Sequence, residues 1–95
     1  MSVKIEMNPE LEAKAESVIQ DLKAKQDEGK IELYNDEMND MISKHGELAL
    51  LAAGCQIVKS SWKNYLILPE EYIEDKFIPR IKVNIVRVLT KNTAE

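Results

Sequence analysis

Hydrophobic side chains recur with helical spacing over the first part of the chain. Asn8 and Pro9 favour the start of a helix, because an Asn side chain can cap the first turn and a proline already has a helical φ. The apolar positions that follow fit one buried helical face; they are Leu11, Ala15, Val18, Ile19 and Leu22. Gly29 favours the end of this helix, because glycine readily adopts the left-handed conformation that closes one. The pattern therefore predicts a helix over residues 9–28.

Two further helices are predicted in the middle of the chain. Apolar positions over residues 31–44 share one helical face; they are Tyr34, Met38, Met41 and Ile42. His45 and Gly46 then interrupt the pattern. The segment ELALLAAGCQIV that follows is apolar nearly all round, which predicts a central helix over residues 46–59.

The last third of the chain is less regular. Pro69 disfavours helix at the residue before it, so residues 64–68 are a possible short extended segment, followed by a short helix over 70–77. Residues 80–90 fit both a strand, because apolar residues alternate at their start, and one face of a helix. We prefer the helix because no partner strand is evident elsewhere.

These elements predict an all-α fold, a small bundle of four to five helices. A chain of 95 residues suits one domain, because it buries about two thirds of its surface around one core. We expect a flexible arm over residues 1–8, a single helical domain over 9–91 and a tail over 92–95. No run approaches the roughly 20 apolar residues of a membrane span, and one cysteine cannot form an internal disulfide framework. A cytoplasmic location without membrane contact is expected.

Charge is distributed unevenly along the chain. Residues 1–47 carry 12 acidic and six basic side chains, whereas residues 48–95 carry five acidic and seven basic ones. A protein that binds nucleic acid usually shows a basic face. The candidates for such a face are Arg80, Lys82, Arg87 and Lys91. Four spaced charges are more typical of a solvated helix face, so the sequence does not favour nucleic acid as a partner.

Two acidic pairs raise a metal hypothesis. Glu37 with Asp40, and Glu71 with Glu74, have spacings that place two carboxylates on one helical face, and Mg²⁺ prefers such oxygen ligands. The pairs resemble the magnesium motifs of all-helical nucleotide pyrophosphohydrolases, although the two half-motifs occur here in the opposite order. That resemblance implies a metal-dependent nucleotide hydrolase as the alternative function. Because acids are frequent in this chain, solvated helix faces are the preferred interpretation, and no cofactor is expected.

Four residues are candidates for a binding site: Trp62, Tyr65, His45 and Glu47. Trp62 and Tyr65 are of the residue types that anchor protein interfaces. His45 is the only histidine, and no nucleophile or orienting acid is evident beside it in the sequence, so catalysis is not expected. Glu47 stands at the start of the most apolar segment, where it either favours the positive end of a helix or occupies a buried position.

The segment HGELALLAAGC, over residues 45–55, resembles a family of small phage and prophage proteins of unknown function with a Gly-Glu-Leu-Ala motif followed by an Ala-Ala pair. The likeness includes Gln26 with Glu28-Gly29, the acidic element at residues 37–40 and Trp62 followed by a proline. It spans about residues 20–90. The resemblance implies a phage-encoded protein made inside a bacterium, with no established activity.

These observations together predict a small homo-oligomeric protein that is not an enzyme. We expect it to act by stoichiometric binding of a bacterial host protein or a small ligand, by analogy with phage proteins of this size, which often block a host defence component.

Overall fold

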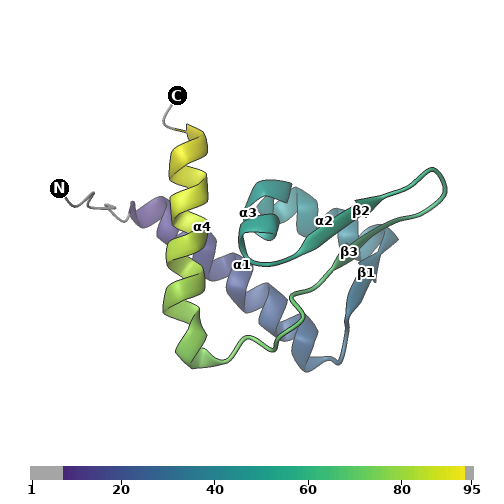
Figure 1. The fold of residues 1–95 in the computed structure, drawn as a ribbon, viewed down its shortest axis with the longest axis horizontal. Coiled ribbons are helices and arrows are strands. Elements are labelled where there is room, and N and C mark those ends of the chain that lie inside the picture. The colour runs from purple at the N-terminus through teal and green to yellow at the C-terminus, as the bar shows by residue number, and fades with distance from the viewer. Residues whose placement is uncertain (1–7, 94–95) are drawn as a thin grey trace.

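The structure, a computed structural model, describes residues 8–93 and shows helices together with a small antiparallel sheet (Figure 1). The elements over these residues are α1 (Pro9–Asp27), β1 (Glu32–Tyr34), α2 (Asn35–His45), α3 (Glu47–Ala52), β2 (Gln56–Lys59), β3 (Asn64–Ile67), a 3₁₀ turn (Asp75–Phe77) and α4 (Ile78–Thr93). The all-α prediction is therefore wrong. Residues 1–7 of the predicted arm and 94–95 of the predicted tail lie outside the described residues.

Helix α1 begins and ends close to its predicted bounds. The Asn8 side chain accepts hydrogen bonds from the backbone N–H groups of Glu10 (2.8 Å) and Leu11 (3.4 Å), as expected of an N-cap. The helix buries Ala15, Val18, Ile19 and Leu22. Gly29 has a φ of 79°, so the chain leaves the helix through a left-handed residue.

The predicted helix over residues 31–44 is a strand followed by a shorter helix. Residues 32–34 form β1, and α2 begins only at Asn35. Asn35 has a φ of 49°, which asparagine tolerates better than most residues, and it turns the chain from the strand into the helix. Leu33 was not part of the predicted helical face. It is fully buried because it lies in this strand and packs within the sheet.

The predicted helix over residues 46–59 ends early, at Ala52. Gly54 has a φ of 107°, a conformation that does not continue a helix, and the Cys55 N–H bonds back to the Leu50 carbonyl (3.0 Å). Residues 56–59 then form β2, where the β-branched side chains of Ile57 and Val58 favour a strand. The apolar character of the segment therefore reflects a short helix and a strand packed on the same core.

The three strands form an antiparallel sheet in the order β1-β3-β2. Cross-strand partners share a face, and the inner face carries the row Leu33, Leu66 and Ile57. The outer face carries two rows, Tyr34, Tyr65 and Val58, and then Glu32, Ile67 and Gln56. Leu33 and Leu66 are fully buried, whereas every member of the outer rows is partly or largely exposed. The possible extended segment over residues 64–68 is strand β3.

The C-terminal segment forms α4, which decides the ambiguity over residues 80–90 in favour of the helix. The helix predicted over residues 70–77 is reduced to the 3₁₀ turn Asp75–Phe77. Helix α4 packs on α1 and α3, and its buried face includes Ile85, Val86 and Leu89. No helix within residues 8–93 combines the length and apolarity needed to cross a membrane.

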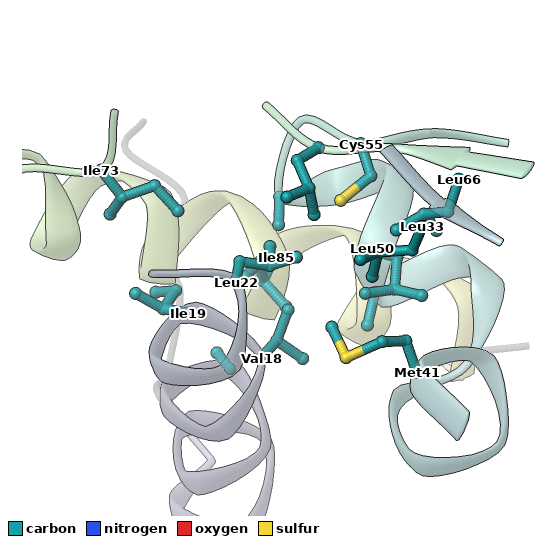
Figure 2. Close-up of a cluster of buried hydrophobic side chains, with 14 of the residues drawn as sticks. Val18, Ile19, Leu22, Leu33, Met41, Leu50, Cys55, Leu66, Ile73 and Ile85 are labelled. Atoms are coloured by element: carbon teal, nitrogen blue, oxygen red, sulfur yellow. The ribbon is translucent and has the colours of Figure 1, made fainter. Parts of the chain in front are cut away.

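The hydrophobic core is one cluster to which both the helices and the sheet contribute side chains. Figure 2 shows side chains from the helices and the sheet converging there, among them Leu22, Met41, Leu50, Leu66 and Ile85. Cys55 belongs to this cluster, and burial raises the pKa of its thiol to about 12. A thiol with so high a pKa stays protonated at neutral pH and is a poor nucleophile.

Gln26 fixes the connection between β3 and α4 against the end of α1. Its side-chain amide donates to the Pro69 and Glu71 carbonyls (3.0 Å each), and its side-chain oxygen accepts from the Ile73 N–H (2.9 Å). A side chain that satisfies three backbone groups holds a segment without regular structure in one path. Ile73, at the end of that segment, is fully buried.

Replacing Gln26 should therefore destabilise the fold. The Gln26→Met variant keeps length and helix propensity but removes all three hydrogen bonds, so we expect a loss of about 2 kcal/mol in the free energy of unfolding. Urea denaturation followed by circular dichroism measures it. The matched control is Gln20→Met, because Gln20 is exposed on the same helix and its side chain bonds only to Glu16 (3.3 Å) among the described residues. Equal midpoints for the two variants would contradict the role given to Gln26.

Candidate functional site

The loop between β2 and β3 is a closed turn that projects from the body of the protein. The Lys63 carbonyl accepts from the Ser60 N–H (3.1 Å) and from the Ser60 hydroxyl (2.5 Å), while the Lys63 N–H donates to the Ser60 Oγ (3.0 Å). Figure 1 shows this hairpin reaching beyond the helices, with its loop at the right-hand end of the molecule. The turn holds its two central residues, Ser61 and Trp62, at the tip.

Trp62 is the most exposed large hydrophobic residue of the described chain, with 93% of its surface open to solvent. It borders a hollow of about 420 Å³. We call the lining of this hollow the hairpin surface; its residues are Val58, Ser60, Trp62, Lys63 and Tyr65. Apolar atoms form most of the lining, so this exposed surface is well suited to bind another molecule.

Tyr34 extends the hairpin surface across the outer face of the sheet, beside Tyr65 and Lys63. The rings of Tyr34 and Tyr65 lie 5.8 Å apart and are tilted by 40°, a common aromatic arrangement. The Lys63 ammonium lies 4.7 Å from the Tyr34 ring centroid and 5.4 Å from that of Tyr65. These are cation–π distances. Lys63 thus brings positive charge onto an aromatic surface.

A hydrogen bond within β1 orients Tyr34. Its hydroxyl donates to the Glu32 carboxylate two residues away on the outer face. This bond, together with desolvation and the negative charge of Glu32, raises the pKa of Tyr34 above its usual value of 10.0. Tyr34 therefore stays neutral and keeps its ring beside Tyr65.

No helix covers the outer face of the sheet within residues 8–93. Helices α2 and α3 are the ones that contact the strands. Their contacts lie on the inner face, where Leu33 and Leu66 are buried and Ile57 packs against the core. The outer aromatic row is therefore accessible to a partner.

His45 lies apart from the hairpin surface and has a structural role. Only 2% of its surface is exposed, and its Nε2 is 2.6 Å from the Asp21 Oδ2 on α1. An ionised carboxylate can only accept, so Nε2 carries the proton. The Lys44 ammonium contacts the same oxygen at 2.9 Å. The cluster joins the end of α2 to α1.

Glu47 lies at the start of α3 and forms an ion pair with Lys59 at the end of β2 (3.1 Å). The pair is exposed on both sides and connects α3 to the base of the hairpin. The structure therefore brings Trp62 and Tyr65 together, places Glu47 behind the same hairpin and places His45 elsewhere.

The acidic pairs of the metal hypothesis are not assembled into one site. The Glu37 carboxylate accepts from Lys25 (3.0 Å) and also from Lys30, and these hydrogen bonds lower the pKa of Glu37. Two ammonium groups on one carboxylate compete directly with a cation. Glu71 and Glu74 are exposed on the connection before α4. No group of three or more His, Cys, Asp or Glu side chains in residues 8–93 is arranged to hold a metal ion.

The basic residues of α4 form a stripe of three. Arg80, Arg87 and Lys91 are exposed and share one helical face, whereas Lys82 points elsewhere and pairs with Glu16 (3.0 Å). Helices α2 and α3, joined at Gly46 and followed by a hairpin, have the order of a helix-turn-helix, in which DNA-binding proteins use the second helix to enter the major groove. Here that second helix is ELALLA, with no basic residue.

Comparison with known proteins gives no match to a protein-family model, to a curated protein or to a solved structure.

The ion pairs of Asp21 should make stability depend on acid pH. Partial burial raises the pKa of Asp21, but the hydrogen bonds from Lys44 and His45 outweigh it and hold that pKa below 3.8. Asp21 therefore stabilises the fold above its unfolded pKa of about 3.9, and the contribution is lost as the pH falls through the lower folded value.

We expect Asp21→Asn to cost about 1 kcal/mol at pH 7, a modest figure because solvent screens a carboxylate that is partly exposed. The difference from wild type should shrink as the pH falls below the unfolded pKa of about 3.9. Urea midpoints across this pH range measure it. The control is Asp40→Asn, an exposed residue with no ion pair among the described side chains. A difference that stays constant with pH would contradict the role given to Asp21.

Trp62 should report its exposure by fluorescence, because it is the only tryptophan. We expect red-shifted emission, quenching by acrylamide nearly as strong as that of a free tryptophan derivative, and little change when urea unfolds the chain. Blue-shifted, protected emission that relaxes on dilution would show instead that a second copy covers Trp62.

Proposed function

We propose that this chain is a small, non-enzymatic binding protein that engages a protein partner stoichiometrically through the hairpin surface. One observation carries the proposal: the only tryptophan is 93% exposed at the tip of a turn closed by hydrogen bonds. A fully hydrated tryptophan gains free energy when a partner removes it from water. Tryptophan and tyrosine are also the residue types that dominate binding energy in protein interfaces.

The rigidity of the turn supports this proposal. Association costs free energy when loops and side chains must be ordered. The Ser60–Lys63 hydrogen bonds order the backbone around Trp62 before any partner arrives, and Lys63 and the two tyrosines are already in contact with one another. Binding a partner therefore requires less additional ordering of the loop and its side chains, so less binding free energy is lost.

A protein fits this surface better than the other partner classes considered. A nucleic acid would meet a net charge of −4 and a second helix without basic residues. A metal-bound nucleotide would have to displace two lysines from Glu37. The resemblance to small phage proteins, which spans about residues 20–90, implies a phage-encoded protein made inside a bacterium. By analogy with phage proteins of this size, the proposed partner is a bacterial host protein and the proposed location is the bacterial cytoplasm. Self-association into a homo-oligomer is part of the same proposal.

The test compares variants of the full chain as baits in a bacterial lysate, with bound proteins quantified by mass spectrometry. A true partner should be retained by wild type and by Tyr72→Ala, and its affinity should fall on the order of 30-fold for Trp62→Ala, because truncating an interface anchor costs about 2 kcal/mol or more. Tyr72 is the matched control because it is aromatic and 45% exposed but lies near the end of α1, where it bonds to Asp27 (2.5 Å).

Calorimetry with the purified partner then gives the stoichiometry, and light scattering gives the oligomeric state of the chain alone. Partners retained equally by all three baits would contradict the proposed surface, as would the absence of any partner.

A further inference from the structure

Strand β2 leaves one edge of the sheet open. Among the strands of residues 8–93 it pairs with β3 on one side only, because the strand order is β1-β3-β2. Its other contact within the described residues is with α3, which lies under the inner face. An unpaired edge presents backbone donors and acceptors to any extended chain that approaches it.

The hairpin turn shows which backbone groups face this edge. The Ser60–Lys63 pair exchanges a backbone hydrogen bond, and paired residues in an antiparallel ladder alternate between hydrogen-bonded and non-bonded positions. Val58–Tyr65 and Gln56–Ile67 are then the hydrogen-bonded pairs. Ile57 and Lys59 therefore direct their N–H and C=O groups away from β3.

A strand added at this edge would bring a side chain to the hairpin surface. Cross-strand partners share a face, so the outer row Tyr34, Tyr65 and Val58 would continue with the added residue opposite Val58. That residue would enter the hollow beside Trp62. An apolar side chain fits there.

The charge of the hairpin selects among extended chains. Residues 56–64 contain Lys59 and Lys63 and no acidic residue. Lys59 is paired with Glu47 (3.1 Å), whereas Lys63 forms no ion pair within residues 8–93. Pairing β2 with the β2 of a second copy would join two hairpins that each carry the positive charge of Lys63, whereas an acidic segment would be attracted to Lys63.

We propose that β2 binds an extended, acidic segment of a protein partner by strand addition, with one apolar side chain of that segment held by Val58, Trp62 and Tyr65. This inference rests on the proposed function and specifies its mode of recognition: main-chain hydrogen bonds supply affinity, and the hollow and Lys63 supply selectivity.

The probe is a library of short random peptides selected on the wild-type protein, from which the tightest binder is synthesised. We expect selected peptides to alternate apolar residues with Asp or Glu. Backbone amide exchange is then followed by NMR with and without peptide. The Ile57 and Lys59 amides should exchange at least about tenfold more slowly in the complex, because binding gives them acceptors. The Val58 and Gln56 amides should already be protected without peptide.

Two variants at one position isolate the backbone group. Both Lys59→Pro and Lys59→Ala remove the Lys59 side chain and its ion pair with Glu47. Only Lys59→Pro also removes the N–H that faces the open edge, and it leaves the β2–β3 ladder intact. We expect peptide affinity about tenfold lower for Lys59→Pro than for Lys59→Ala. Thermal unfolding checks that both variants fold. The exchange measurement is made on the wild-type chain and does not depend on the folding of a variant.

The outcomes separate this inference from the proposed function. If peptides bind and Trp62→Ala weakens them, but the Ile57 and Lys59 amides stay fast and Lys59→Pro binds like Lys59→Ala, strand addition is wrong and the hairpin surface stands. If Trp62→Ala changes nothing, the hairpin surface itself is wrong. Three other outcomes would each contradict the proposal that β2 binds an acidic segment. They are failure to select any peptide, selection of basic peptides, and protection of both amides in a dimer of the free chain.

Discussion

The register of the three-stranded sheet determines both the core and the candidate site. Leu66 at the centre of β3 is fully buried opposite Leu33, with Ile57 in the same row. Because side chains alternate between faces, burying this row places Tyr34, Tyr65 and Val58 on the other face. A slip by one residue would exchange the two rows and expose the leucines, at a cost of about 1.5–3 kcal/mol for each buried leucine. Core packing thus keeps the aromatic row outside.

Local signals in the sequence located some elements well and others poorly. Helix α1 was predicted closely because a capping Asn, a Pro and a long apolar period all lie within one segment. Strand β3 was anticipated only as a possible extended segment over residues 64–68. Strands β1 and β2 were missed because they have three or four residues, too few for a period to show, and because their pairing joins segments far apart. The helix predicted over residues 46–59 was drawn too long because the segment is apolar throughout, whereas the helix has already ended before Gly54.

The candidate site was predicted in part. Trp62 and Tyr65 stood out by residue type, which sequence alone provides. Lys63 and Tyr34 were missed because their place beside Tyr65 depends on the turn and on the sheet register. One signal for Lys63 was available in the sequence. The pair Trp62-Lys63 lies between two short segments rich in β-branched or aromatic residues, as in the turn of a β-hairpin. His45 was assigned to binding because its partner, Asp21, lies 24 residues earlier and cannot be inferred from spacing.

The packing of α1 on α4 has a consequence for how the protein matures. The first described helix to leave the ribosome finds its main helical neighbour in the last one, which also packs on α3. Non-local contacts of this kind cannot form until the intervening chain has been made. The nascent chain therefore keeps an apolar face of α1 open until α4 has been made, and the core closes only then. A shortened product lacking α4 would have an incomplete core and be a target for proteolysis, so the hairpin would accumulate mainly on molecules that contain α4.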